Sequence, residues 1–584
     1  MKKIYYNIIG VACAVFGFTS CSDFLEIKSQ SEIVLEDFWN EKADVDNVVA
    51  GCYSRMQAND VISRMIIWGE GRSENVMGGT NAVNNADLMN VLKENITAKN
   101  SFTKWDGFYT VINRCNTVLK YAPDVAAHDP GYTQGELRAT VAEVSALRDL
   151  CYFYLIRTFR NVPYSTVAYT DDDQVMDLVP SKFEDVLDSL ITDLESIKTS
   201  AIRRYPTTKP EYQTGRITQD AVYAMLCEMY LWKKDYDNCI KYADLIIESK
   251  KEQAKERRSK GSGTGSLYGQ STNDARFNGF PLISDMLSSS RYGNAYQSIF
   301  VEGNSQETVF ELVFSDRAGR GMPANAAIND LFGNADVTMG LLAPSTTLTE
   351  DVAKTSQRII YDDLNKTYDV RLYENFNTES GCIAKYVYRD IDVSTTGSKP
   401  VASYTSKYTA GQNSTNWIIY RLTDIMLLKA EAICQKLQVG SDAEIEAYNA
   451  PLLEEAFTLV NAVNKRSVCQ STLSDTLKAD NYKSKGLMEE LVLKERQREL
   501  MFEGKRWYDL VRRSMRDGNT DVLTAAAGRR DGINSQYVQS FFGSTTNGMY
   551  AMFWPYNDEE VKVNLNLAAV QNPAFGSGEG NIQK

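Results

Sequence analysis

The chain has 584 residues, and its 63 Lys and Arg against 76 Asp and Glu give a formal net charge of −13. This acidic balance argues against a nucleic acid as the natural partner, because cationic side chains drive phosphate binding. The single histidine, His128, excludes zinc sites built from several histidines, and its surroundings AAHDPGY contain no nucleophile elbow, so we expect a surface residue.

The N-terminus, MKKIYYNIIGVACAVFGFTSCSDF, has the parts of a secretory signal. Lys2 and Lys3 precede an apolar run, residues 8–18, that is too short to span a bilayer. Thr19 and Ser20 precede Cys21 in an arrangement that resembles a bacterial lipobox. We therefore expect residues 1–20 to be a signal peptide and Cys21 to carry acyl chains that anchor the protein in a lipid bilayer. The alternatives are an ordinary signal with a chance cysteine, or an uncleaved apolar N-terminus.

Helical periodicity dominates the rest of the chain and predicts a mostly α fold. Amphipathic runs cover 36–57, 105–121, 138–160, 181–197, 217–233, 236–250, 421–437, 452–466 and 487–502. The pair within 217–250 matches a tetratricopeptide repeat, and 421–437 with 452–466 matches a second, split one. Cys227 and Cys239 occupy positions where paired helices approach closely. We expect free thiols there, with a disulfide as the alternative.

Long stretches rich in Gly, Ser, Asn and Thr separate these helices, at 58–104, 251–350, 391–416 and 514–550. We interpret them as irregular loops with a few short strands, one of them at 307–315, ETVFELVFS. Loops of this length are usually functional or disordered. A rigid helical frame that carries such loops suits recognition better than catalysis.

The segment ERQRELMFEGKRWYDLVRR, residues 495–513, alternates acidic and basic residues with apolar ones. The spacing predicts two short helices held together by partly buried ion pairs of Glu495, Arg498, Glu503 and Arg506. Its low net charge makes it a poor phosphate binder. We therefore interpret this segment as structural.

Several stretches in this order resemble the SusD/RagB nutrient-uptake lipoproteins of Bacteroidetes along nearly the whole chain. They are CSDFLE, DFWNEKADVDNVVAGCYSRM, WDGFYTVINRCNTVL, EVSALRDLCYFYLIRTFRNVPY, the pair at 217–250, IYRLTDIMLLKAEAI, NAVNKRS, ERQRELMFEGKRWYDLVR and FWPYNDEEVKVNLNLAAVQNPAF. The departures are FRNVPY, where the family usually has Gly-Asp before Val-Pro, and Leu422-Thr423, where Tyr-Ala is usual.

The resemblance implies an N-terminal helical region at 21–250, a loop-rich ligand-facing insertion at 251–420 and a C-terminal helical region at 421–584. It also implies a lipid-anchored protein on the outer face of the outer membrane that caps a SusC-like TonB-dependent transporter. Such a protein captures oligosaccharides, or peptides in some members, and breaks no bond. A glycoside hydrolase, which needs two carboxylates across a sugar, and a protein-docking scaffold are the alternatives.

The loop IIWGEGRSENVMGGTNAVNN, residues 66–85, combines the residue types that bind sugars, and it resembles the place where the family puts part of its binding surface. We expect Trp68, Arg72, Asn75 and Asn81 to contact the ligand, opposite Tyr268, Tyr292 and Phe332. Trp68 has an alternative role as a buried anchor beneath the loop. Tyr296 and Phe300 are expected in the core, and no residue pattern indicates a metal, a cofactor or a catalytic group.

Overall fold

The computed structural model describes residues 38–171, 173–259, 277–314, 324–333, 340–349, 369–377, 379–396, 400–408, 412–469, 477–543 and 547–575. Helices make up most of this part of the chain, and the strands form small sheets, which confirms the predicted fold class. Cys21 and Tyr268 lie outside the described residues. Within those residues, no helix combines the length and the apolar character needed to cross a membrane.

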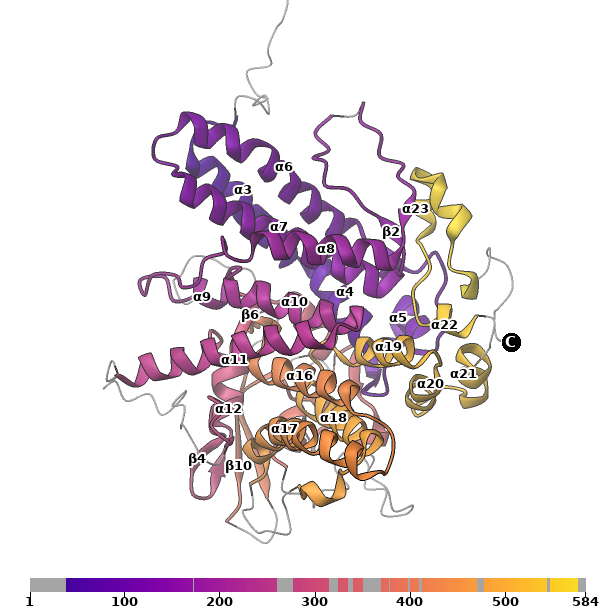
Figure 1. Ribbon diagram of the computed structural model, residues 1–584. Coiled ribbons are helices and arrows are strands. Elements are labelled where there is room, and N and C mark those ends of the chain that lie inside the picture. The colour runs from indigo at the N-terminus through magenta and orange to yellow at the C-terminus, as the bar shows by residue number, and fades with distance from the viewer. Residues whose placement is uncertain are drawn as a thin grey trace, which may run out of the picture.

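The N-terminal half is a series of packed helices (Figure 1). They are α3 (Lys42–Met56), α4 (Asn59–Glu70), η2 (Thr80–Asn84), α5 (Ala86–Leu92), η3 (Ser101–Thr103), α6 (Asp106–His128), α7 (Gln134–Phe159), α8 (Phe183–Ile197), α9 (Tyr212–Gly215), α10 (Gln219–Lys233) and α11 (Tyr236–Ser259). Thr133 begins α7 with a capping box to Glu136, which satisfies donors at the helix N-terminus. His128, the last residue of α6, is exposed as predicted.

Both predicted repeat pairs are present as antiparallel helix pairs. The first consists of α10 and α11, and the second of α16 (Leu422–Lys436) and α17 (Ala443–Ser467). Helices α11 and α16 pack against each other and join the two pairs. Cys227 and Cys239 are buried free thiols whose Sγ atoms lie 3.7 Å apart, in agreement with the expected free state.

All strand pairs are antiparallel. Strand β6 (Thr308–Leu312), which the sequence predicted, pairs with β12 (Trp417–Arg421). One four-stranded sheet has the order β11 (Val401–Lys407), β10 (Tyr388–Ser394), β5 (Arg291–Tyr292), β4 (Met286–Ser288). The remaining pairs are β1 (Val76–Gly78) with β7 (Leu342–Pro344), β2 (Val162–Pro163) with β3 (Pro180–Ser181), and β8 (Phe376–Asn377) with β9 (Cys382–Ile383).

The other elements are mostly short. They are α12 (Asn294–Tyr296), the π-helical turn η5 (Gln297–Glu302), α13 (Ala326–Phe332), α14 (Thr346–Thr349), α15 (Arg371–Asn375), η9 (Ala479–Asn481), α18 (Lys485–Leu500), α19 (Arg506–Asp517), α20 (Asp521–Ala527), α21 (Ser535–Phe542), α22 (Gly548–Ala551), α23 (Asp558–Val563), η10 (Leu565–Val570) and η11 (Pro573–Phe575). Tyr296 and Phe300 are buried, as predicted.

All four stretches predicted as irregular contain regular structure, and 251–350 includes the end of α11, helix α13 and several short strands. Helix α4 lies within 58–104, helices α20 to α22 begin within 514–550, and strands β10 and β11 occupy much of 391–416. Helix α4 was missed because its stretch was classed as irregular from the Gly, Ser, Asn and Thr residues that follow the helix at 71–85. The two strands were missed because their residues lack a clean alternation.

The segment at 495–513 is structural, as predicted, and its ion pairs are fully buried rather than partly buried. Glu495 pairs with Arg371 and Arg498, and Arg506 pairs with Glu74. Glu503 pairs with Arg421 and Lys385, which come from distant segments. The segment 495–513 therefore joins parts of both halves of the chain through charged groups that solvent does not reach.

Candidate ligand-binding site

Trp68 lies inside the molecule and does not form a surface platform. It belongs to α4, its side chain is 0% exposed, and its ring stacks on Phe108 at a centroid distance of 4.9 Å. The indole Nε1 donates a hydrogen bond to the backbone oxygen of Phe102 at 2.8 Å. The indole has no free face or donor for a sugar, so the expectation of a ligand contact is wrong and the buried-anchor alternative describes Trp68.

The side chains of Arg72 and Asn75 also form their hydrogen bonds inside the protein. The Arg72 guanidinium is 0% exposed, donates from Nε to Glu94 at 2.8 Å, and donates to the backbone oxygens of Ala551 and Met552. Asn75 is likewise fully buried and donates from Nδ2 to Glu70 at 2.6 Å. Arg72 ties the loop to the C-terminal segment and Asn75 ties it to α4, so their predicted role in ligand contact is wrong.

The remaining predicted site residues do not converge on one surface. Tyr292 is buried, and its hydroxyl donates to the backbone oxygen of Cys469 at 2.9 Å. Phe332 is buried with its ring near those of Tyr386 and Phe502. Both were expected to face the ligand, and both are core residues instead. Asn81 lies exposed on η2, so it stays a candidate for ligand contact.

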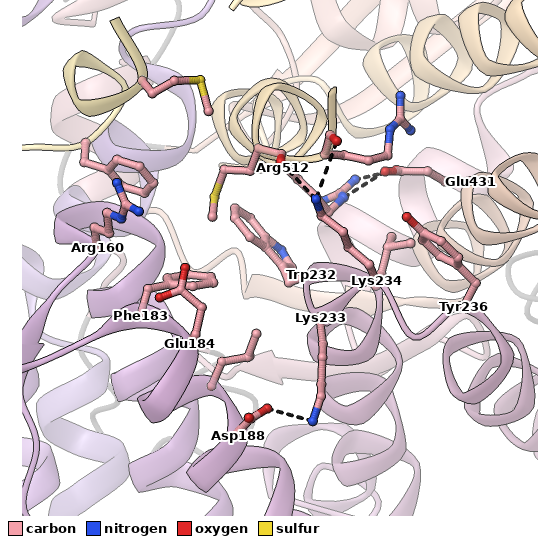
Figure 2. A pocket seen from close by; sticks show the side chains of 16 residues that line it. Arg160, Phe183, Glu184, Asp188, Trp232, Lys233, Lys234, Tyr236, Glu431 and Arg512 are labelled. Atoms are coloured by element: carbon pink, nitrogen blue, oxygen red, sulfur yellow. Dashed lines mark hydrogen bonds and ion pairs between the residues drawn. The ribbon is translucent and has the colours of Figure 1, made fainter. Parts of the chain in front are cut away.

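A cavity of about 430 Å³ opens where the ends of several helices meet (Figure 2). Helices α8, α10, α11, α16, α19 and α22 contribute to it, together with Arg160, which directly follows α7. The lining residues are Arg160, Phe183, Glu184, Leu187, Asp188, Leu231, Trp232, Lys233, Lys234, Tyr236, Glu431, Arg512, Met515, Arg516, Met549 and Phe553. We call this space the Trp232 cavity.

Two buried donors that line the Trp232 cavity have no hydrogen-bond partner. The Trp232 side chain is 5% exposed and its Nε1 is unpartnered. Arg512 uses Nε and Nη2 to bind Glu431, and Nη2 also donates to Asp509, whereas its Nη1 is unpartnered. Buried polar atoms are normally hydrogen-bonded, so two unpartnered buried donors beside an aromatic ring make this cavity the candidate site for a ligand with acceptor oxygens.

Charged side chains surround the opening, and most of them are paired (Figure 2). Lys233 pairs with Asp188 at 2.7 Å, and Lys234 donates to the backbone oxygen of Met515 at 3.1 Å. Burial would lower the pKa of Arg512, but Glu431 and Asp509 raise it well above its ordinary value, so the guanidinium stays charged. The cavity therefore combines an aromatic wall with fixed, charged hydrogen-bonding groups, which is the composition that binds polar ring compounds.

A second cavity, of about 550 Å³, lies between α6, the segment after β2 and the C-terminal helices α23 and η10. Several of its polar side chains are already hydrogen-bonded within the protein. Tyr109 donates to the backbone oxygen of Pro163, Tyr152 to that of Ser165, and Asn113 to that of Tyr169. None of the lining residues carries a buried polar atom without a partner. This cavity therefore lacks the unpartnered buried donors that single out the Trp232 cavity, and we rank it second.

Sequence reasoning missed Trp232 and Arg512. Both lie in segments that were interpreted as structural, the first repeat helix and the segment at 495–513. The sequence around Trp232, YLWKKDY, gives only a weak signal, an aromatic residue beside two lysines at a predicted helix end. The open donors follow from the way α10 and α19 pack together, which no local pattern reveals.

Comparison with known families places both ends of the chain in one group of proteins. A sequence model described as "SusD family" matches residues 350–575, and a second one, described as "Starch-binding associating with outer membrane", matches residues 23–231. SusD-like protein P38 of Formosa agariphila is 24% identical over 515 residues, which are 84% of this chain and 88% of that protein. SusD-like protein P2 of the same organism is 22% identical, over 88% of this chain and 91% of that protein.

Solved structures share the fold. A SusD superfamily protein from Bacteroides vulgatus aligns with a TM-score of 0.61 at 16% identity, covering 91% of this chain and 98% of its own. A protein described as a laminarin-binding SusD-like protein aligns with a TM-score of 0.56 at 18% identity, covering 91% of this chain and 99% of its own. Alignment over almost the full length of both chains shows that this chain has the same overall fold as these two proteins.

Proposed function

This chain belongs to the SusD/RagB family, and we propose from that premise that it is an oligosaccharide-binding lipoprotein of the outer membrane. It captures a glycan at the cell surface and delivers it to a SusC-like TonB-dependent transporter, without breaking a bond. The laminarin-binding protein of the same fold supports a glycan as the ligand class. The peptide-binding alternative within the family and the glycoside hydrolase are outcomes of the test below.

The observation that carries the proposal for the site is the pair of open donors in the Trp232 cavity. A pyranose ring has an apolar face rimmed by hydroxyl groups, which matches an indole beside unpartnered N–H groups. The Trp232 ring has Phe183 at a centroid distance of 5.8 Å, which holds it in place. The site therefore binds a sugar ring against Trp232, with ring or hydroxyl oxygens accepting from Trp232 Nε1 and Arg512 Nη1.

Membrane attachment and delivery rest on different residues. The lipobox-like sequence before Cys21 supports an acyl anchor, and the family description "associating with outer membrane" supports the location. Such an anchor leaves the folded domain outside the bilayer. The transporter partner follows from the family alone, and co-purification of a TonB-dependent transporter with the tagged full chain is the measurement that tests it.

The test of ligand binding uses the full chain, purified in detergent, on arrays of oligosaccharides and of peptides. The tightest glycan is then titrated by calorimetry into the wild type, Trp232→Phe and Trp554→Phe. Trp232→Phe removes the open N–H but keeps an aromatic ring. Trp554→Phe is the matched control, because Trp554 Nε1 is also buried and unpartnered but Trp554 lines neither cavity.

We expect Trp232→Phe to weaken glycan binding by about 1 kcal/mol, roughly fivefold, and Trp554→Phe to leave it unchanged. Equal affinities of all three proteins for the glycan would show that it does not bind in the Trp232 cavity. Binding of peptides with no bound glycan would favour the peptide-binding alternative. New reducing ends after incubation with the bound glycan would show a hydrolase, which needs two carboxylates at the scissile bond.

A further inference from the structure

Arg160, at the edge of the Trp232 cavity, has a strained backbone. It directly follows α7 with φ 69° and ψ −73°, and Asn161 N donates to the backbone oxygen of Phe159 at 3.0 Å across it. These are the features of a three-residue γ-turn with positive φ, which is rare and costs free energy for any residue other than glycine. Strain of this kind is concentrated at functional sites, where a side chain is needed at that place.

The Arg160 guanidinium has no carboxylate partner among the described residues. Its Cζ lies 5.0 Å from the ring centroid of Tyr550 and 5.8 Å from that of Phe553, which belongs to the cavity lining. The two rings support the guanidinium by cation–π contact without using its N–H groups. Arg160 therefore presents a charge, held in position, at the opening (Figure 2).

The lining of the Trp232 cavity has a small excess of positive charge only among the groups that have no ion-pair partner. It includes the five cations Arg160, Lys233, Lys234, Arg512 and Arg516 and the three carboxylates Glu184, Asp188 and Glu431. Asp188 and Glu431 are neutralised by Lys233 and Arg512, so Glu184 is the one lining carboxylate without an ion-pair partner in the described part of the chain. Arg512 is also paired with Asp509, and Arg516 is paired with Asp517 and Glu489, so Arg160 and Lys234 are the lining cations without a carboxylate partner in that part of the chain.

We propose that the Trp232 cavity selects acidic oligosaccharides, in which a carboxylate or sulfate group is bound by Arg160 while a sugar ring lies on Trp232. This inference rests on the proposed function and adds the charge class of its ligand. A guanidinium binds planar or tetrahedral oxyanions through two parallel N–H groups, and such charge-assisted bonds are about twice as strong as neutral ones. Arg160 is the specificity-determining residue of the site.

The proposal predicts opposite effects for two residues on the same opening. Arg160→Gln removes the positive charge, so acidic glycans should bind about tenfold more weakly. Glu184→Gln removes an unpaired negative charge, so the same glycans should bind about twofold more tightly. Arg138→Gln, at an exposed arginine of α7 outside both cavities, is the matched control and should change nothing. Arg160→Gly should weaken binding as Arg160→Gln does, while the melting temperature is unchanged or higher.

The experiment is a titration of matched glycan pairs into the full-length protein and these variants. Each acidic glycan is paired with its neutral form, for example trigalacturonate with its carboxyl-reduced form and a sulfated galactose oligosaccharide with its desulfated form. We expect the neutral form of the bound glycan to bind at least tenfold more weakly and to be insensitive to Arg160→Gln. The member of the set that binds distinguishes a carboxylate from a sulfate.

Neutral and acidic forms of equal affinity, or an Arg160→Gln protein with wild-type affinity, would overturn the charge selection. If that glycan still lost affinity in Trp232→Phe, the proposed function would stand without this inference. A wild-type protein that bound no member of the array, acidic or neutral, would overturn both.

Discussion

Glu70, the last residue of α4, has a buried carboxyl group whose pKa is raised by that burial. Desolvation raises its pKa to about 7, although hydrogen bonds from Asn75 and from the backbone N–H of Phe502 act in the opposite direction. The second carboxylate oxygen is buried without a partner. Ionisation of this group therefore costs folding free energy, since the hydrogen bonds and the nearby charge of Arg506 offset only part of the lost solvation.

The first prediction is a pH dependence due to Glu70. Its pKa in the folded state, about 7, exceeds the ordinary value of 4.5, so the folded protein binds a proton that the unfolded chain has released. The free energy of unfolding should therefore fall as pH rises from about 4.5 to about 7, by up to about 3 kcal/mol. The free energy of unfolding of Glu70→Gln should lack this pH-dependent contribution. Urea denaturation of both proteins at pH 5 and pH 8 measures the difference. A difference between wild type and variant that is the same at both pH values would contradict it.

Arg72 shows why a promising residue pattern was not a site. In sequence it stands with Trp68 and two asparagines in a glycine-containing loop, yet its partners Ala551 and Met552 are more than 470 positions away. Residue type and local spacing identify the chemistry that a side chain can perform. They do not reveal whether the hydrogen-bonding groups of that side chain are already paired with a distant segment of the chain.

The second prediction concerns Arg72. Arg72→Met should destabilise the protein by about 3 kcal/mol, because two backbone oxygens and Glu94 lose a buried donor while Arg530 still pairs with Glu94. Affinity for the bound glycan should stay at the wild-type value in the folded variant. Denaturation measures the first effect and calorimetry the second. A variant with wild-type stability and at least tenfold lower affinity for the glycan would show that this loop belongs to the binding site.

At the scale of elements, α18 carries the most heavily paired carboxylate of the buried network. Glu499 accepts from Arg371, Arg421 and Arg466, which come from α15, the end of β12 and α17. Burial alone would raise the pKa of Glu499, but the three guanidinium groups hold it well below its ordinary value. One carboxylate on α18 thus joins three elements that are far apart in sequence.

The third prediction is a loss of stability on replacing Glu499. Glu499→Gln should destabilise the protein by about 3–5 kcal/mol at pH 7, since buried guanidinium groups lose their counter-charge. Because the pKa is depressed in the folded state, this stabilisation is present above the ordinary value of 4.5 and is lost as pH falls toward the lower folded value. The exposed pair Lys562–Glu559 is the control, and Glu559→Gln should change stability little. A pH-independent difference between wild type and Glu499→Gln would refute the charge argument.

Most of the helical frame could be predicted because its apolar residues recur at helical spacing, even in helices such as α10 that are buried on nearly every side. The predicted runs at 105–121, 181–197 and 217–233 correspond to α6, α8 and α10, with boundaries that differ by a few residues except at the C-terminal end of α6. Helix α4 was missed, because its stretch was classed as irregular from the Gly, Ser, Asn and Thr residues that follow the helix at 71–85. The resemblance to the family identified the fold, whereas the sequence did not locate the cavity.

At the scale of the whole molecule, the Trp232 cavity is assembled from distant parts of the chain. Arg160, Trp232 and Arg512 are separated by 72 and 280 positions, and no motif connects them. One continuous core extends from Val45 to Leu567 and fixes the helix ends that surround the cavity. The rigidity of that core holds the open donors at fixed positions, which reduces the entropy lost when a ligand binds.

The fourth prediction concerns attachment to the membrane. Cys21→Ala should abolish acylation and leave the protein soluble or unprocessed, because the thiol is the expected acceptor of the lipid. Metabolic labelling with a palmitate analogue and membrane fractionation measure the two effects. Cys52→Ala, at a buried cysteine of α3, is the control and should still be labelled. A Cys21→Ala protein that is acylated and sediments with the outer membrane would disprove the assignment of the anchor.

The central claim is that a glycan binds in the Trp232 cavity, and a crystal structure of the protein with the tightest glycan tests it most directly. We predict a sugar ring against Trp232, with glycan oxygens about 2.7–3.2 Å from Trp232 Nε1 and from Arg512 Nη1. An acidic group should lie on Arg160. A glycan seated instead beside Asn81 on η2, with the Trp232 cavity filled only by solvent, would contradict the account.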